Sequence, residues 1–384
     1  MSVSGAHTPQ VGTGERERLV EDFVRLCEIE SPSLHERPMA DAVAAECNVL
    51  GLEVTEDASA RATGSDAGNL IARLPGPAGA PTILLCAHLD TVPLDGPVEV
   101  RREGGVLSNR HRAILGADNK AAVAVILAAL RHHVQRGQAP VGLELAFTTA
   151  EEPGLLGAKE LDRHALRSGF GFVLDHASPI GELITAAPTY YRLLARFTGA
   201  AAHAGIRPED GRNAIVAAGR AVAAMSLGRL DDRTTANAGT IEGGTARNVV
   251  AELCQVELEA RSLDDERAGQ AIAEMVDRCS DAAGETECDV DTTVEQLCRA
   301  FKLARSAPPV RVAAAALEDL GIDPVYRSSG GGSDANALIA NGLPVLNVAN
   351  GTQRNHQPDE SVTVQALETM LDVTLRIIER SAEA

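Results

Sequence analysis

The chain has 384 residues, of which 45% are hydrophobic and 23% charged, so it is long enough to bury a full core and to form two domains. Its net charge of −19 would repel a nucleic acid, and its aromatic content of 2% leaves few side chains for stacking on bases. We therefore exclude nucleic acid as a partner.

Neither a targeting segment nor a membrane span is expected. The amino-terminal stretch lacks the apolar core of a secretory signal, and no later run approaches the roughly 18 consecutive apolar residues of a membrane helix. The seven cysteines are scattered and form no CxxC pair, which is typical of small buried thiols rather than of disulfides or a thiolate metal site. We expect a cytoplasmic protein without membrane contact.

The first predicted elements are two helices and a strand. Apolar residues recur at helical spacing between Glu15 and Ile29, and a second helix is predicted from Arg37 to Leu50, just before a glycine. Asn69 to Leu74 has the pattern of a strand, and a turn-rich segment follows it.

The next strand ends in two polar residues. The continuous apolar run from Ile83 to Ala87 predicts a strand that is covered on both faces, as in a parallel sheet. His88 and Asp90 follow it, and residues two apart on an extended chain project to the same side. Because ligands bind at the carboxyl edge of such sheets, we expect a site here.

Two further strands also lead into acidic residues. The apolar run from Val141 to Thr149 is followed by Glu151 and Glu152, and the run from Phe170 to Leu174 is followed by Asp175. One such ending would be ordinary. Their recurrence on a presumed common sheet edge predicts a shared site.

The last two candidates come from a helix start and from a late strand. Asp118 begins a helix that is apolar almost all round and must therefore be buried. His356 follows the predicted strand from Leu343 to Gly351. Alone, an aspartate at a helix start is usually a cap, but together with His88 and the acidic residues these two complete a set of hard metal ligands.

The middle of the chain has its own order of elements: strand, helix, two strands, helix and strand. The predicted ranges are Tyr190 to Phe197, Arg212 to Leu227, Thr234 to Ile241, Val249 to Arg261, Asp264 to Ala282 and Glu287 to Val294. This is the order of a ferredoxin-like unit.

The predicted fold class is therefore α/β, with a mixed, mostly parallel sheet, helices on both faces and an inserted ferredoxin-like α+β domain. We place a lid or dimerisation domain at 188–304, between the two parts of a catalytic domain at 1–187 and 305–384. A helix from Ala307 to Leu320 continues the catalytic domain.

Five residues form the candidate metal centre: His88, Asp118, Glu152, Asp175 and His356. Mixed imidazole and carboxylate ligands suit zinc, with cobalt and manganese as alternatives. If Asp118 bridges two divalent ions, each ion receives three protein ligands and keeps an open position. Such a pair of ions lowers the pKa of a bridging water and polarises the carbonyl that the water attacks.

Two carboxylates beside this set receive other roles. Neighbouring side chains on an extended segment point to opposite sides, so we assign Glu152 to the metal and Glu151 to the substrate side. Glu151 is then the general base and acid, which takes the proton of the water and passes it to the leaving nitrogen. Asp90 is interpreted as the partner that fixes the tautomer and orientation of His88.

Several motifs, in this order along residues 15 to 380, resemble the dinuclear zinc peptidase family of glutamate carboxypeptidase, peptidase T, aminoacylase and the acetylornithine and succinyl-diaminopimelate deacylases. The motifs are HLDTVP, GADNKAAV, TAEEPGLLGAKEL, VLD and the final NxH. The segments GGTARNVV, ELEARSLDDE and SSGGGSDAN are most similar to the peptidase T-like tripeptidases.

The resemblance implies how the ligands are shared between the ions. Asp118 would bridge, His88 and Asp175 would bind one ion, and Glu152 and His356 would bind the other. It also implies a cis peptide bond after Asp118. Asn119 stands where many relatives carry a second aspartate, a departure that removes no ligand.

The resemblance also assigns residues that would contact the substrate. His203 matches the position of a histidine that holds the scissile carbonyl oxygen, an oxyanion-stabilising role. Asn248 and Arg261 match positions that grip the carboxylate end of the substrate, to which a guanidinium is well fitted. The glycine loop that contains Gly332 and Ser333 opens a predicted helix, so we expect its free backbone amides to bind the same carboxylate.

Three hypotheses for the function follow. The first is a metal-dependent exopeptidase, a peptidase T-like enzyme for short peptides with free amino ends. The second is a deacylase of N-acyl amino acids or N-acyl diamines, because the metal core serves any amide. The third is a relative that binds peptides without cleaving them, against which the presence of all five ligands and the base argues.

The quaternary structure is a further expectation from the resemblance. Relatives commonly pair through the small domain, so we expect a homodimer through the inserted domain. The sequence leaves open whether His203 serves the site of its own chain or that of the partner.

Overall fold

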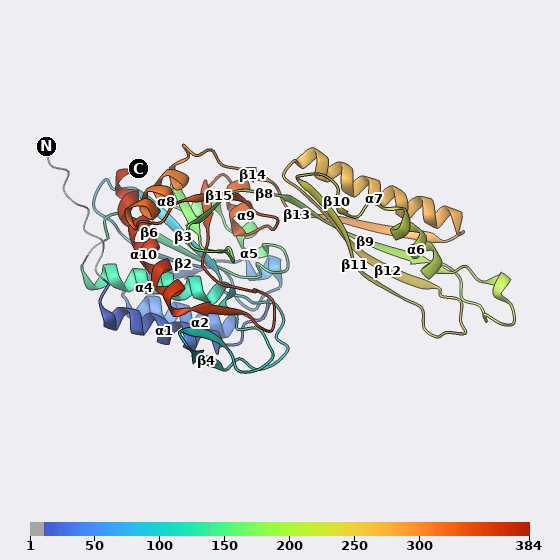
Figure 1. The fold of residues 1–384 in the computed structure, drawn as a ribbon, viewed down its shortest axis with the longest axis horizontal. Coiled ribbons are helices and arrows are strands. Elements are labelled where there is room, and N and C mark those ends of the chain that lie inside the picture. The colour runs from blue at the N-terminus through green and yellow to red at the C-terminus, as the bar shows by residue number, and fades with distance from the viewer. Residues whose placement is uncertain (1–10, 138) are drawn as a thin grey trace. The chain divides into compact units, whose positions relative to one another are not determined.

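The computed structural model describes residues 11–137 and 139–384 (Figure 1). It divides into two compact units with separate hydrophobic cores. The first unit runs to Thr185 and also includes Lys302–Ser328 and Ser333–Ala384, and the second comprises Ala186–Phe301 and Ser329–Gly332. The second unit thus covers most of the range 188–304 that the sequence predicts for the inserted domain.

The first unit is built on a mixed sheet with the order β1-β2-β6-β3-β7-β16-β8-β14, and β15 pairs with β8. The bounds are β1 (Glu53–Glu56), β2 (Leu70–Leu74), β3 (Thr82–His88), β6 (Gly142–Thr148), β7 (Phe170–Val173), β8 (Glu182–Ala187), β14 (Phe301–Lys302), β15 (Val325–Ser328) and β16 (Val345–Val348). The neighbours β6, β3, β7 and β16 are parallel, whereas β1, β2 and β8 pair antiparallel. The predicted mixed sheet with a parallel centre is confirmed.

Helices cover both faces of this sheet (Figure 1). Their bounds are α1 (Thr13–Cys27), α2 (Arg37–Val49), α3 (Ala60–Thr63), α4 (Ala117–Gln135), α5 (Leu156–Glu160), α8 (Pro308–Asp319), α9 (Asp334–Ala340) and α10 (Val364–Arg380). In the chain of contacts α1–α4–α10–α8, each helix packs on the next, and Ile83, Leu85 and Ala87 of β3 join this core. Cys86 points the other way, where its sulfur lies 4.0 Å from Asp334 of α9.

A small antiparallel sheet lies beside the start of α4. It has the order β17-β5-β4, with β4 (Val100–Glu103), β5 (Val106–Asn109) and β17 (Ser361–Thr363). These strands are short and are absent from the elements that the sequence predicts, as is α10. Their pairing brings the segment before β17 close to the loop that precedes α4, where Glu360 accepts a hydrogen bond from the amide of Leu115.

The second unit has the predicted ferredoxin-like arrangement. Its elements are β9 (Thr189–Thr198), α6 (Ala214–Ala224), β10 (Gly228–Arg229), β11 (Thr234–Gly243), β12 (Leu253–Ser262), α7 (Asp265–Glu285) and β13 (Asp289–Cys298). The sheet has the order β10-β11-β12-β9-β13, every pair is antiparallel, and α6 and α7 pack on it. The edge strand β10 is the addition to the predicted pattern.

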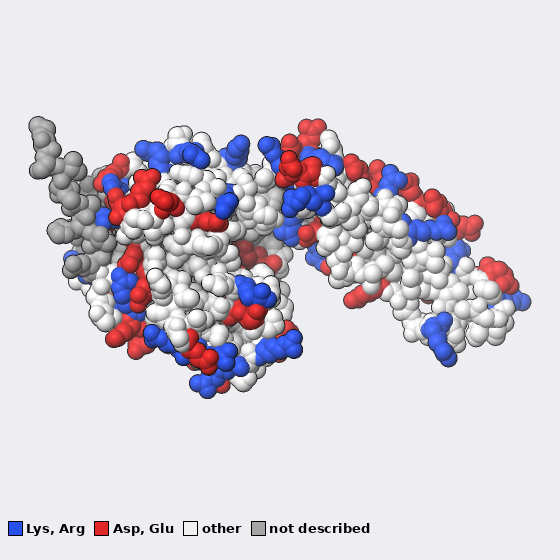
Figure 2. All heavy atoms as spheres, in the orientation of Figure 1, with Lys and Arg blue, Asp and Glu red and all other residues white. Residues whose placement is uncertain are grey.

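Three features of the chain as a whole bear on the expectations from the sequence: its cysteines, its helices and its surface charge. All seven cysteines lie within the described residues, are buried and form no disulfide, as predicted. Among the described residues, no helix combines the length and apolar character that crossing a membrane requires. On the face seen in Figure 2, acidic and basic side chains are interspersed rather than gathered into a basic patch.

Candidate metal centre

The candidate ligands from the strand ends lie at one edge of the sheet. His88 is the last residue of β3 and lies opposite Thr148 of β6 in the parallel register. Cys86 lies opposite Val173 of β7 in the same way. The residues that follow β6 and β7 therefore emerge beside His88, as the sequence predicts for a common edge.

Asp118 reaches the same place from the start of α4. Its backbone is not helical (φ −84°, ψ 104°), and the following peptide bond to Asn119 is cis, as the family resemblance implies. The rest of α4 is buried nearly all round. The carboxylate of Asp118 therefore projects from the N-terminal end of a buried helix.

Two sets of three side chains meet here and share Asp118. In the first set, Nε2 of His88 lies 3.4 Å from Oδ1 of Asp118 and 3.7 Å from Oδ1 of Asp175. In the second, Nε2 of His356 lies 3.1 Å from Oδ2 of Asp118 and 2.9 Å from Oε1 of Glu152. Within each set, one donor atom from each residue lies within 4.8 Å of the others.

The donor atoms fit divalent cations. Oδ1 of Asp118 and Oε1 of Glu152 are buried and accept no hydrogen bond, despite the nearby imidazoles. A buried carboxylate oxygen without a hydrogen-bond partner is costly. A cation bound between the two sets would satisfy both oxygens, and imidazole with carboxylate is the ligand combination of zinc sites.

The two histidines are surrounded by negative charge. Burial alone would lower the pKa of His88, but the neighbouring carboxylates of Asp118 and Asp175 outweigh burial and hold this pKa well above its usual value. Asp118 and Glu152 raise the pKa of His356 to about 10. His356 is the accessible member of the site, since 48% of its side chain is exposed.

The acidic residues outnumber these histidines. Burial raises the pKa of Glu151, of Glu152 and of Asp175 above their usual values, and mutual repulsion among the carboxylates adds to it. Such a surplus of buried acids is what a pair of cations would neutralise.

Asp90 lies beneath the site and is fully buried. Its Oδ1 lies 3.4 Å from Nδ1 of His88, but the nearer acceptor is the backbone oxygen of Asp90, at 3.0 Å. A proton on Nδ1 leaves the lone pair of Nε2 directed to Asp118 and Asp175. The orientation of His88 thus depends on both the backbone and the side chain of Asp90.

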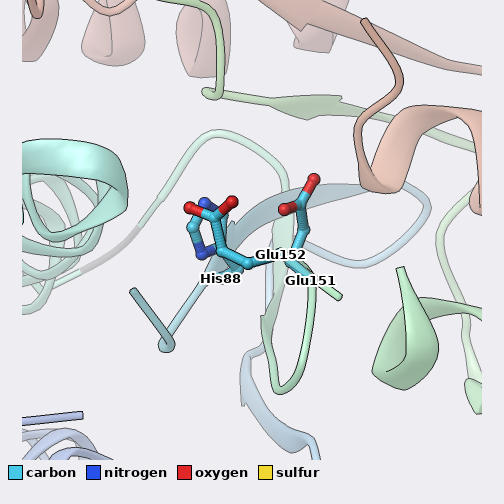
Figure 3. A group of neighbouring side chains, drawn as sticks. All are labelled: His88, Glu151 and Glu152. Carbon is cyan, nitrogen blue, oxygen red and sulfur yellow. The ribbon is translucent and has the colours of Figure 1, made fainter. Parts of the chain in front are cut away.

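Glu151 and Glu152 both approach His88 (Figure 3). The expectation that their side chains point to opposite sides is wrong, because the segment is a turn and not an extended strand. Ala150 adopts a left-handed conformation (φ 50°), and the amides of Gly154 and Leu155 both donate to the backbone oxygen of Glu151. Position in the sequence therefore does not separate the roles of the two glutamates.

The backbone of this turn is held by side chains from other elements. Four consecutive amides donate to them: Thr149 to Asn69 (3.1 Å), Ala150 to Glu36 (2.9 Å), Glu151 to Asp90 (2.9 Å) and Glu152 to Asp90 (3.1 Å). Sequence reasoning missed Glu36 and Asn69. No local pattern marks them, because their partners are backbone groups about 80 to 114 residues away along the chain.

The other ligand segments are supported in the same manner. Asn347 of β16 accepts from the amide of Asp175 (3.0 Å) and donates to its carbonyl (2.8 Å). Glu360 accepts from the amide of Asp118 (2.9 Å). Asn347 and Glu360 are also absent from the residues that the sequence singles out.

The glycine loop differs from its expected role. The amide of Ser333 donates to the side chain of Asn336 (3.1 Å), and the amide of Gly331 donates to Ser329 Oγ (3.0 Å). These two amides are therefore not free for a substrate carboxylate. Ser333 is buried and accepts from Asn347, so its side chain belongs to the support of the site. Gly332 stays a candidate for substrate contact.

The remaining candidates belong to the second unit. His203 forms an isolated β-bridge with Val249, and the amide of Ala204 donates to the backbone oxygen of Asn248 (3.0 Å), so the loops of His203 and Asn248 lie side by side.

Arg261 is the second-last residue of β12, at the opposite end of this strand from Leu253. Its guanidinium carbon is 3.9 Å from the centre of the Tyr190 ring, and Nη2 and Nε donate to the carboxylate of Glu259 (2.9 and 3.1 Å). A third bond joins Nη1 to the backbone oxygen of Gly330 (3.2 Å). The guanidinium is therefore oriented in advance, with Glu259 as a competitor for any carboxylate ligand.

Comparisons with known proteins cover nearly the whole chain. The sequence profile of peptidase family M20/M25/M40 matches residues 84–380. The uncharacterised protein YqjE of Bacillus subtilis (strain 168) is 35% identical over 366 residues, which cover 95% of this chain and 99% of that protein.

Two solved structures are similar over the same extent. The crystal structure of aminopeptidase PepT from Bacillus cereus is 37% identical with a TM-score of 0.84. The structure of a tripeptidase from Staphylococcus aureus is 32% identical with a TM-score of 0.89. Each alignment covers 96% of this chain and 99% of the other, so the similarity includes both units.

Proposed function

The chain belongs to peptidase family M20/M25/M40, and we propose that it is a metal-dependent exopeptidase that removes residues from the free amino end of short peptides, in particular tripeptides. The observation that carries this proposal is the pair of three-residue sets that share Asp118, with Glu151 beside them. The full-length similarity to a tripeptidase and an aminopeptidase supports the peptide substrate.

We propose that two divalent ions, zinc or alternatively cobalt or manganese, bind between the two sets. His88 and Asp175 would hold one ion, Glu152 and His356 the other, and Asp118 both. When bound, such ions act as Lewis acids that polarise the scissile carbonyl and acidify the attacking water. The accessible edge of His356 marks the side from which a peptide would approach.

In this proposal Glu151 moves the proton. Its carboxylate takes a proton from the attacking water and delivers it to the nitrogen that leaves, so that the amine departs neutral. The hydrogen bonds from the amides of Glu151 and Glu152 to Asp90 fix the turn and limit the positions that the base can adopt. His203 would stabilise the negative charge on the carbonyl oxygen.

We propose that His203 acts on the site of a partner subunit. At about 3.3 Å per residue, β12 spans roughly 26 Å from Leu253 to Arg261, and His203 lies beyond Leu253. A tripeptide spans only about 10 Å. His203 and Arg261 of one chain therefore cannot contact the same tripeptide, whereas two copies can each contribute one end of the sheet.

Exposed apolar residues of the second unit support such a homodimer. Ile241 of β11 and Leu253 of β12 are each 52% exposed, and Ile215 and Val216 of α6 are 43% and 45% exposed. We propose that these exposed apolar side chains lie in the interface between two copies of the chain. We also propose that the protein is cytoplasmic, since its seven cysteines form no disulfide among the described residues, which suits a reducing compartment.

Hydrolysis assays with protein stripped of metal and reloaded with zinc or cobalt test the function. The panel contains tripeptides and dipeptides with free amino ends, the same peptides with blocked amino ends, and N-acetyl and N-succinyl amino acids. We expect cleavage of the free tripeptides and loss of activity with a chelator. A preference for the acylated compounds would make the protein a deacylase, and inactivity on the whole panel would favour a protein that binds peptides without cleaving them.

A further inference from the structure

Glu360 is a buried carboxylate whose oxygens face backbone amides. Its Oε2 accepts from the amides of Leu115 and Gly116, both at 2.8 Å, and its Oε1 accepts from the amide of Asp118 at 2.9 Å. Only 1% of Glu360 is exposed. Hydrogen bonds from three amides of one short loop leave this carboxylate turned toward the loop and not toward the metal sets.

The loop that Glu360 holds has an irregular backbone. Gly116 has a positive φ of 74°, and Asp118 and Asn119 depart from helical geometry although they open α4. A backbone in this conformation cannot complete its own helical hydrogen bonds, so its amides need acceptors from elsewhere. Glu360 supplies them for Leu115, Gly116 and Asp118.

Glu360 also connects this loop to the segment that carries His356, another ligand of the second set. It follows His356 by four residues, and its own amide donates to the backbone oxygen of Gln357 (2.9 Å) in the turn between them. The next residue, Ser361, pairs with Ser108 of β5. The segment that carries His356 and the loop that carries Asp118 are therefore joined through one side chain.

We propose that Glu360 is a positioning residue that sets the spacing between Asp118 and His356, and thereby the affinity of the second metal position. This inference rests on the proposed metal centre but not on the identity of the substrate. Residues that orient metal ligands typically change metal affinity by 10- to 100-fold when they are replaced.

The test compares Glu360→Gln with Glu144→Gln by titration of zinc into the stripped full-length protein against a chromophoric chelator. A glutamine has a single acceptor oxygen and turns an amide donor toward amides of the loop, so it cannot satisfy all three. Glu144 is a matched control, because this buried carboxylate of β6 also accepts backbone amides, from Arg167 (2.9 Å) and Ser168 (3.1 Å), and binds no candidate ligand.

We expect Glu360→Gln to weaken the affinity for the second zinc equivalent 10- to 100-fold and to affect the affinity for the first equivalent less. Glu144→Gln should leave both affinities unchanged. A Glu360→Gln protein with wild-type affinity for both equivalents would overturn the proposal. So would equal weakening in the two variants, since that result would indicate a general loss of stability.

Two additional measurements keep the test decisive. If Glu360→Gln does not fold, Glu360→Asp, which retains the charge but shortens the reach, is expected to fold and to show the same selective weakening; wild-type affinity there would overturn the proposal. The rise in melting temperature on adding zinc reports binding without any turnover. A wild-type protein that binds two zinc ions but cleaves no peptide would refute the proposed function and leave this inference standing.

Discussion

At the scale of single residues, the protonation state of Glu151 depends on what occupies the site. Burial raises the pKa of this carboxyl well above its usual value, and the neighbouring Asp175 and Glu152 add to the effect. A general base must be ionised to accept a proton. Cations between the two ligand sets would lower this pKa, so metal binding would both activate the water and ionise the base.

The role of Glu151 leads to a first prediction. Glu151→Gln keeps the shape of the side chain but removes its ability to take a proton, so we expect turnover to fall by about 10²- to 10⁴-fold. Because Glu151 is not a ligand in our assignment, zinc content measured by elemental analysis should stay at the wild-type value. The neighbouring variant Glu152→Gln should instead lose metal, and normal turnover in Glu151→Gln would refute the mechanism.

The histidines lead to a prediction about pH. The neighbouring carboxylates of Asp118 and Glu152 raise the pKa of His356 to about 10 in the metal-free protein, so this imidazole carries a proton at neutral pH. A metal binds only the neutral form, so binding must release the proton. Apparent zinc affinity should therefore rise with pH up to about 10, and activity should fall in acid.

Calorimetric titration of zinc in two buffers with different ionisation enthalpies measures this proton release. We expect His356→Ala to release fewer protons per zinc than the wild type, since the group that gives up the proton is gone. Zinc affinity that does not change between pH 6 and 9 would contradict the prediction.

At the scale of elements, the turn after β6 is defined by acceptors that lie outside it. Ala150 has a left-handed backbone, which costs a residue other than glycine about 1 kcal/mol and persists where the surroundings impose it. Glu36 accepts the amide of Ala150 and also bonds Ser65 and the amide of Leu34. Through these bonds the start of α2 is tied to the residue before Glu151, the proposed general base.

We therefore predict a selective effect of Glu36→Gln. Loss of one acceptor at this buried site should loosen the turn and lower kcat by about tenfold, while KM and zinc stoichiometry change little, since the hydrogen-bond partners of Glu36 include no candidate metal ligand. Steady-state kinetics at saturating zinc measure the split. A variant that changes KM alone would show that the turn orients the substrate and not the base.

The elements also show what the sequence can reveal. The strands of the sheet centre are continuous apolar runs, and the polar residues after them stand out against that background, so β3, β6 and β7 could be predicted together with His88 and Asp175. Short strands such as β4 and β17 lack such a pattern. Glu36 and Glu360 resemble ordinary surface charges in the sequence, because what marks them is burial against amides of distant residues.

At the scale of the whole molecule, the candidate functional residues are distributed over both units. The first unit holds all candidate metal ligands and the proposed base Glu151, and the second holds His203, Asn248 and Arg261. The order of strands and helices predicts both units, since each has a simple pattern of connections. Sequence order does not show whether a residue of the second unit acts in the site of its own chain or in that of a partner. The answer depends on the length of β12 and on how two chains assemble.

Mixing two inactive variants tests this assembly. His203→Ala lacks the oxyanion contact but keeps its base, and Glu151→Gln has the reverse defect. If His203 serves the partner's site, each mixed dimer contains one site with both groups intact, so unfolding and refolding a 1:1 mixture should recover roughly a quarter of wild-type activity, since half of the dimers are mixed. Each variant taken alone through the same refolding is the control. If His203 serves its own chain, every site in the mixture lacks one group, and the mixture would stay as inactive as its components.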